Sequence, residues 1–275
     1  ILDSGNKFSN VFKFEDKDQT TSALSGGRYI LAKTNLETAT LSSKLTKKQR
    51  FNNLDLKSKL GIDFFNSSYR AIGNDWYQVK YHNIASQNII EPFGIFEFNH
   101  SSNEKIDYEI GFRYHYYELD TDNYTTKTSL SSDDRQNYAW SLGANYNLQN
   151  GQKLFTHVSR AYRSPRLDEI ISLIKPSPSH THIKHQYSND IELGYEVNVE
   201  RKRYKASIFR TLIKNQIYLN QTTLKNENFD PSIHQGLEIE FDQSINDKLN
   251  LKSNATFIDS YFTKGVEKGN ETSYV

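Results

Sequence analysis

Apolar and polar residues alternate with a period of two along much of this 275-residue chain. In residues 105–117, KIDYEIGFRYHYY, one face carries isoleucine, phenylalanine and tyrosine, and the other carries aspartate, glutamate, glycine, arginine and histidine. Successive side chains of a β-strand point to opposite faces, whereas helical residues share a face every three or four positions. The pattern therefore predicts a strand with one apolar and one wet face.

The same alternation returns at intervals along the chain. It is weaker in the last of these segments, where Ser253 and Asp259 fall on the apolar face. Most of the runs are ten or more residues long, whereas strands of soluble sheets usually have about five or six. A tilted strand needs roughly 9–11 residues to cross a bilayer. The further alternating segments are 53–64, 137–148, 190–200, 237–242 and 249–261.

Short and long connections alternate between these segments. Asn150-Gly151 is a strong two-residue hairpin signal. Tight turns at one end and long polar loops at the other are typical of an outer-membrane barrel. The short turns are predicted at 46–48, 102–104, 150–151, 201–203 and 247–248, and the long loops at 67–89, 120–134, 164–186 and 220–232.

These features predict an all-β fold, an antiparallel up-and-down transmembrane β-barrel with lipid outside and a polar lumen. Strands in a bilayer have to close into a barrel because their backbone groups need partners. The chain supplies about ten or eleven strands, so we expect it to be part of a larger barrel. The alternative is a large soluble β-sandwich or solenoid, in which the apolar faces would point inward.

The composition agrees with a hollow structure. Hydrophobic residues make up only 36%, aromatic residues 13%, and the mean hydropathy is -0.76, which is low for a compact soluble core. The net charge of +1 argues against a nucleic-acid partner. The sequence has no cysteine, and no apolar run is long enough for a transmembrane helix. It also lacks methionine, so we expect a fragment or a processed product.

Four segments, in their order and spacing, resemble the C-terminal barrel of TonB-dependent outer-membrane receptors. LFTHVSRAYRSPRLDEI is similar to the family's aromatic–Ser-Arg–aromatic-Arg-x-Pro-x-Leu-x-Glu pattern, and IKHQYSNDIELGYE to its Glu-Leu-Gly strand. In the second, His185 and Gln186 stand where proline and glutamate are usual. The resemblance covers most of the chain from about residue 54. The segments are 91–117, 154–170, 183–196 and 233–241.

The resemblance implies a 22-stranded barrel around an N-terminal plug in the bacterial outer membrane. Residues 1–275 would form a single barrel fragment, with the plug and the final strands lying outside this chain. It further implies active import of a scarce metal chelate, such as a ferric siderophore, haem or a cobalamin-type ligand. The TonB complex, acting through the plug, and outer-membrane lipid would be the partners, without a cofactor or covalent chemistry. A passive porin is the alternative, and a barrel hydrolase a more distant one.

The segment SHTHIKH places His180, His182 and His185 within six residues. Neutral imidazole is a common ligand for metal ions and iron porphyrins. No cysteine or fixed carboxylate completes a metal site, so a solvated polar loop is the favoured interpretation. We keep the three histidines as candidate contacts to a transported ligand.

Arg163, in the segment YRSP, is the fourth candidate ligand contact. Its planar guanidinium could hold a carboxylate or catecholate with two parallel hydrogen bonds. The alternative is that Tyr162, Arg163 and Pro165 only form the rim where a strand becomes a loop.

Two further groups of residues have plain interpretations. The aromatic residues Tyr114, Tyr116, Tyr117 and Trp140 are expected in the interfacial girdle, with Tyr117 breaking the alternation where the strand leaves the bilayer. His157 and Ser159 share a strand face about 7 Å apart, too far for a direct nucleophile–base hydrogen bond. The sequence therefore predicts no catalytic residue.

Overall fold

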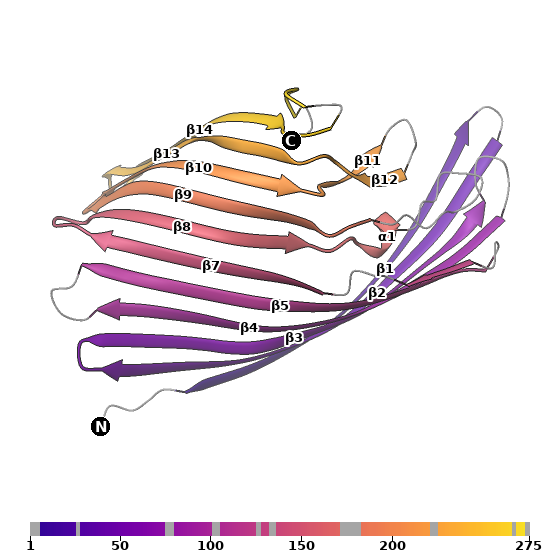
Figure 1. Ribbon diagram of the computed structural model, residues 1–275, viewed down its shortest axis with the longest axis horizontal. Helices are drawn as coiled ribbons and strands as arrows, with labels where there is room; N and C mark the ends of the chain where they lie inside the picture. Colours follow the sequence, from indigo (N-terminus) through magenta and orange to yellow (C-terminus); the bar gives the residue numbers. More distant parts are fainter. Residues whose placement is uncertain are drawn as a thin grey trace.

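The computed structural model is one long antiparallel sheet that curves into an open wall (Figure 1). It describes residues 6–25, 28–74, 80–100, 105–124, 128–131, 136–170, 183–220, 225–265 and 268–272. No helix in this part of the chain is long and apolar enough to cross a membrane. The elements are β1 (Lys7–Ser25), β2 (Arg28–Phe51), β3 (Leu54–Asn74), β4 (Lys80–His100), β5 (Ile106–Asn123), β6 (Thr128–Ser131), β7 (Gln136–Asn147), β8 (Gln152–Arg163), α1 (Leu167–Ile170), β9 (Gln186–Val199), β10 (Lys202–Lys214), β11 (Ile217–Asn220), β12 (Lys225–Asn228), β13 (Ser232–Asn246) and β14 (Leu249–Phe262).

The strands follow one another up and down the wall. Their order is β1-β2-β3-β4-β5-β7-β8-β9-β10-β13-β14, while β6 pairs with β5, and β11 and β12 form a separate small sheet. Figure 1 shows β1 to β5 extending past the ends of β7 to β10. Every pairing within the wall is antiparallel, as in β3–β4 and β8–β9. The predicted all-β, up-and-down architecture is confirmed.

One end of the wall has tight turns. β7 and β8 join through Asn150 and Gly151, both with positive φ (58° and 69°), the conformation that a type I′ hairpin turn requires. The turn predicted at residues 46–48 is wrong, because β2 continues to Phe51 and turns at Asn52, whose φ is 48°. Polar residues do not end a strand here, since Thr46 and Lys48 stay in the ladder with β3 and one face of the wall is wet.

The long loop predicted at residues 67–89 is also wrong over most of its length. β3 runs to Asn74 and β4 begins at Lys80, and the two remain paired to their ends. The outward amides of Asn66 and Asn88 are hydrogen-bonded at 2.7 Å. The segment is polar because its outer face has left the apolar belt, whereas its backbone remains in the sheet.

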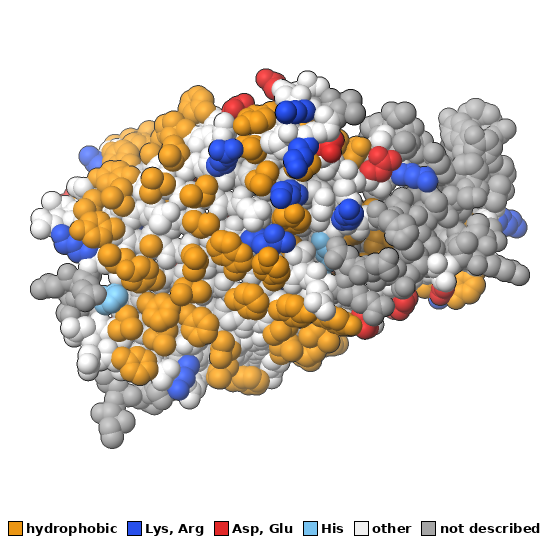
Figure 2. All heavy atoms as spheres, viewed as in Figure 1, with side chains coloured by type: hydrophobic (Ala, Val, Ile, Leu, Met, Phe, Trp, Pro, Cys, Tyr) orange, Lys and Arg blue, Asp and Glu red, His pale blue; other side chains and the backbone are white. Residues whose placement is uncertain are grey.

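The outer face of the wall is apolar. Ile110, Leu193 and Ile208 are 43%, 53% and 58% exposed, and Figure 2 shows such side chains spread across the sheet. The inner face is charged: Lys57 and Lys59 both donate to Glu97, at 2.7 and 2.5 Å. The apolar side chains point outward and the charged and polar side chains point inward, as predicted.

Towards the loop end, the inner face carries a small buried apolar cluster. It lies beyond the Asn66–Asn88 pair, and α1 covers it from the β8–β9 connection. Tyr117 is 1% exposed and belongs to this cluster, so its assignment to the interfacial girdle is wrong. It continues the inward series of Arg113 and His115, and the doubled tyrosine places one ring on each face. The members are Tyr69, Ala71, Tyr81, Ala85, Tyr117, Leu119, Leu167 and Ile170.

Candidate functional site

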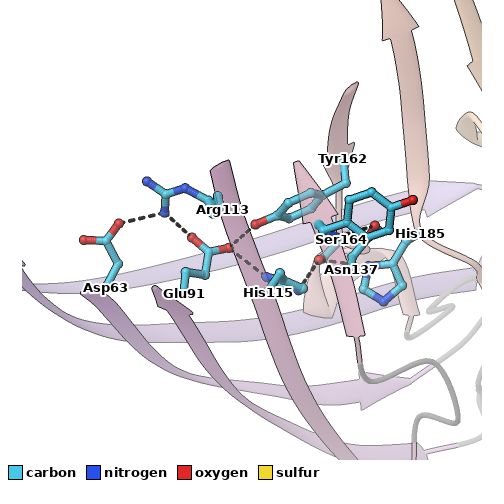
Figure 3. Close-up of polar contacts among 9 residues, drawn as sticks. Asp63, Glu91, Arg113, His115, Asn137, Tyr162, Ser164 and His185 are labelled. Carbon is cyan, nitrogen blue, oxygen red and sulfur yellow. Dashed lines mark hydrogen bonds and ion pairs between the residues drawn. The ribbon is translucent and has the colours of Figure 1, made fainter. Parts of the chain in front are cut away.

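On the inner face, on the side of the apolar cluster that is nearer the turn end, three strands bring opposite charges together. Arg113 of β5 donates to Asp63 of β3 at 2.7 Å and to Glu91 of β4 at 2.6 Å (Figure 3). Asp63 and Glu91 are direct cross-strand partners in the β3–β4 register. The guanidinium therefore bridges two carboxylates that would otherwise repel each other across the ladder.

Glu91 is the centre of this interior network. Besides Arg113, it accepts hydrogen bonds from His115 Nδ1 at 2.7 Å and from the Tyr162 hydroxyl at 2.8 Å. Its side chain is 12% exposed, and that of His115 is 2% exposed. A carboxylate so shielded from water is stable only when its oxygens are well provided with donors. Glu91 has three, two from the neighbouring strand β5 and one from β8.

Tyr162 departs from the alternation of its own strand. Val158 and Arg160 point outward, and position 162 would follow them. The β7–β8 ladder, however, ends at the pair Trp140 and Arg160. Freed from β7, the Tyr162 ring turns to the interior and lies 4.8 Å from the His115 ring. Because β7 and β8 are no longer paired at this level, the Tyr162 side chain of β8 can reach the network on the inner face.

A chain of hydrogen bonds continues from His115 to the β8–β9 connection. Ser164 Oγ lies 2.8 Å from His115 Nε2 and 3.1 Å from His185 Nδ1. A serine hydroxyl has one donor and two acceptor sites, so Ser164 can join the two imidazole rings. The His185 ring packs edge-on against Tyr117, with ring centroids 5.3 Å apart. Both ends of the connection are therefore fixed to the inner wall.

Arg163 has its own partner within the same segment. Its two terminal nitrogens donate to the two Glu169 oxygens at 2.8 and 2.6 Å. Glu169 also accepts from the backbone N–H of Arg166 at 2.8 Å, as the glutamate of a capping box does at a helix start. The fork that we expected to hold a ligand is thus filled by Glu169, and its ligand role stays a prediction.

The predicted histidine cluster is placed only in part. His185 is buried in the interior network, whereas His180 and His182 lie outside the described residues. Across the residues that the structure describes, no group of three or more histidines, cysteines or carboxylates is arranged to hold a metal ion. A ligand contact by the three histidines stays a prediction.

A cavity of about 420 Å³ adjoins the network on the inner face. The β1–β4 wall contributes Lys17, Thr38 and Tyr69, and the β8–β9 segment contributes Ser164 and Arg166. Lys17 and Arg166 face this space together with several hydroxyl groups. Asp168 lines it too, and its carboxylate lies 3.3 Å from Arg166 Nε, so the charge of Arg166 is already partly balanced.

Sequence reasoning did not identify the interior network. The alternation placed Asp63, Arg113 and His115 on wet faces, but the strand register that joins them is not visible in the pattern. Tyr162 was considered only as part of the rim where the strand becomes a loop, and its parity predicts the outer face. The YRSP segment was singled out, although for Arg163 rather than for its neighbours.

The family model "TonB dependent receptor-like, beta-barrel" matches residues 2–275. No curated protein sequence matches the chain. Among solved structures, the ferric yersiniabactin uptake receptor FyuA from Yersinia pestis gives a TM-score of 0.77 at 13% identity, over 100% of this chain and 43% of that one. The siderophore receptor PiuA from Acinetobacter baumannii gives 0.73 at 16% identity, over 96% and 45%.

The copper transporter OprC shares the fold at a TM-score of 0.67 and 13% identity, over 94% of this chain and 44% of that one. The chain therefore spans less than half the length of the receptors that it matches. Proteins of this family are transporters rather than enzymes, so the hydrolase alternative is set aside. With its oily exterior, wet interior and full-length match to the family model, the chain belongs to the TonB-dependent receptors and forms part of a barrel in the bacterial outer membrane.

Proposed function

We propose that the complete protein imports a metal chelate across the outer membrane with energy from the TonB complex. The match to the family model over residues 2–275 carries this proposal. Relatives of the same fold include receptors for ferric siderophores and a copper transporter. A ferric siderophore is our first candidate for the cargo, with haem and cobalamin-type ligands as the other members of the class.

In this proposal, residues 1–275 act as one barrel segment, and the rest of the protein supplies a plug and the remaining strands. The plug would contact TonB and transmit the energy. The inner wall would contribute to the ligand chamber through the cavity beside Ser164. Its Lys17 side chain suits the carboxylate or catecholate oxygens of an iron chelate, and Arg166 would join it by exchanging its contact with Asp168 for the ligand.

The candidate ligand contacts fall into two groups. His180 and His182 would reach the ligand from the β8–β9 connection. Arg163 and His185 are held in the wall by Glu169 and Ser164, so a ligand would reach them only after that connection has moved. The proposal therefore expects ligand binding to rearrange this connection.

The test is growth of a strain lacking its other iron receptors, complemented with the complete gene under iron starvation. Ferric citrate, a catecholate, a hydroxamate and haem would be supplied one at a time, each with and without a functional TonB. Growth on one source that depends on both the gene and TonB supports the proposal. Rescue that is independent of TonB and falls steadily with solute size would instead support the passive porin.

A further inference from the structure

The inner face of β2 is lined almost entirely by hydrogen-bond donors. Ser42 donates to Asp63 across the ladder, so the even-numbered positions of β2 share the inner face with the charged network. From Thr34 to Arg50 these positions carry threonine, serine, lysine, arginine and one leucine, Leu36, and none carries a carboxylate. We call this series, from Thr34 to Arg50, the donor track.

The positive charge of the donor track is only partly balanced by its neighbours. Arg50 donates twice to Asp55 of β3, at 2.5 and 2.8 Å. Among the residues that the structure describes, however, no carboxylate pairs with Lys44 or Lys48, nor with Lys17 on the adjacent strand β1. This side of the inner face therefore presents uncompensated cations.

The inner face of β9 and β13 has the opposite character. Each of these strands directs three carboxylates inward, and the cations between them are shared: Arg203 pairs with Glu196 and Glu240, and Lys205 with Glu192 and Glu240. An anion in the lumen is therefore attracted towards β2 and repelled from β9 and β13. The six carboxylates are Asp190, Glu192, Glu196, Glu238, Glu240 and Asp242.

The donor track connects two hollows of the inner face. Thr38 of the track lines the cavity of about 420 Å³ near the loop end, where Lys17 also faces the space. Lys48 and Arg50 line a second hollow of about 920 Å³ at the turn end. At about 3.3 Å per residue, Thr38 and Arg50 lie about 40 Å apart along the strand, which is close to the full thickness of a bilayer. The short-turn end of such barrels faces the periplasm.

We propose that the donor track is the side of the lumen along which an anionic ferric chelate crosses the barrel. The inference rests on the proposed function, to which it adds the charge of the cargo and the wall that guides it. Carboxylate or catecholate oxygens would pass from one inward donor to the next, about 7 Å further along β2. Hydroxyl groups between the cations keep each contact weak, and passage requires binding that is favourable but easily exchanged.

The first test measures charge along the track in the full-length receptor in detergent. This chain has no cysteine, so Thr46→Cys, between Lys44 and Lys48, supplies a single thiol once any cysteine elsewhere is replaced by serine. Relative to free cysteine, an anionic methanethiosulfonate should label it at least fivefold faster than a cationic one. Lys44→Gln with Lys48→Gln should abolish this preference. Thr256→Cys, which pairs with Glu238, is the matched control and should favour the cationic reagent.

The second test measures binding and passage. Ferric citrate should slow labelling of Thr46→Cys by a neutral reagent at least threefold, and the double lysine variant should lose this protection. In cells, the same variant should lower iron uptake from ferric citrate or a ferric catecholate at least fivefold, with less than a twofold change in surface affinity. Lys252→Gln, which removes an inward cation paired with Asp242, should change neither quantity.

Folding of each variant is checked by the shift in gel mobility that intact barrels show before heating. Equal labelling by the two charged reagents, absence of protection by ferric citrate, or unchanged uptake in the folded double variant would each overturn the proposal. Labelling and protection require no transport, so they decide the proposal even if the wild type takes up no chelate. That last result would instead refute the proposed function.

Discussion

Removing the charge of Glu91 should weaken the hydrogen bonds that hold the β8–β9 connection against the barrel wall. Glu91→Gln preserves shape but replaces one carboxylate oxygen with an amide that cannot accept. Arg113, His115 and Tyr162 then compete for a single neutral acceptor. Hydrogen bonds to a charged group contribute about 1.5–3 kcal/mol each. Because one acceptor remains and the site is slightly exposed, we expect a total loss of about 2–4 kcal/mol.

Glu97→Gln is the matched control on the same strand and the same inner face. Glu97 is 22% exposed, and its partners are the flexible ammonium groups of Lys57 and Lys59. Exposed ion pairs of this kind contribute about 0.2–1 kcal/mol. The two variants therefore remove the same charge from the same strand, with a difference of about 1–3 kcal/mol expected between them.

The assays are the denaturant midpoint of the refolded full-length receptor and hydrogen exchange across residues 162–170. Glu91→Gln should lower the midpoint and speed exchange in that segment, because Tyr162 then shares one neutral acceptor with His115 and Arg113. Glu97→Gln should leave the exchange of that segment unchanged. If both variants shift the midpoint equally, or if the segment stays protected in Glu91→Gln, Glu91 does not anchor the connection.

Three further changes test other parts of the wall. Gly236→Ala places a Cβ against the backbone oxygen of Phe257 on the next strand, so it should cost about 2 kcal/mol or more in denaturant stability; a neutral effect would contradict the close approach. Arg163→Lys removes the two-pronged contact to Glu169 and should speed hydrogen exchange in residues 166–170 without lowering barrel yield. Leu193→Arg puts a charge on the lipid face, which costs about 2–4 kcal/mol near the bilayer centre, and should reduce the folded fraction in liposomes but not in detergent.

The sequence predicts which face of each strand points outward, because residues that contact lipid are apolar and residues that contact water are polar, and the two kinds alternate along the strand. Ile110 and Leu193 point outward as their alternation requires, and both are exposed. Tyr117 was misplaced because two tyrosines in succession look like an interruption, although parity alone assigns them to opposite faces. Parity was the better guide, since residue type does not distinguish a girdle ring from a buried one.

Strand ends were less predictable, and for a related reason. Outside the apolar belt, both faces of a strand are polar, so the alternation fades while the backbone ladder continues. Residues 46–48 of β2 have this character. In residues 67–74 of β3 the usual order is changed instead, because the apolar residues Tyr69 and Ala71 lie on the inner face. Hydrogen bonding to neighbouring strands keeps such segments extended, and a single sequence does not show which neighbours they have.

The interior network could not be predicted because it depends on register and on one broken ladder. Asp63, Glu91 and Arg113 come together only when three strands are aligned to the residue. Tyr162 joins them because the β7–β8 pairing stops at the Trp140–Arg160 pair, before β8 reaches Tyr162. Each of these is a tertiary property, whereas the wet face on which the charges lie is local.

The β8–β9 connection is held to the wall by two anchors of different kinds, and this difference bears on how it can move. Leu167 and Ile170 are buried in the apolar cluster with Tyr69 and Tyr117, and separating them exposes apolar surface to water. Ser164 is held by hydrogen bonds, whose net contribution is smaller because water or a guest molecule can replace the partner. The polar anchor should therefore release first, at the edge of the cavity where Ser164 and Arg166 face the interior. A guest that offers acceptors there would open the connection from the cavity side while α1 stays seated.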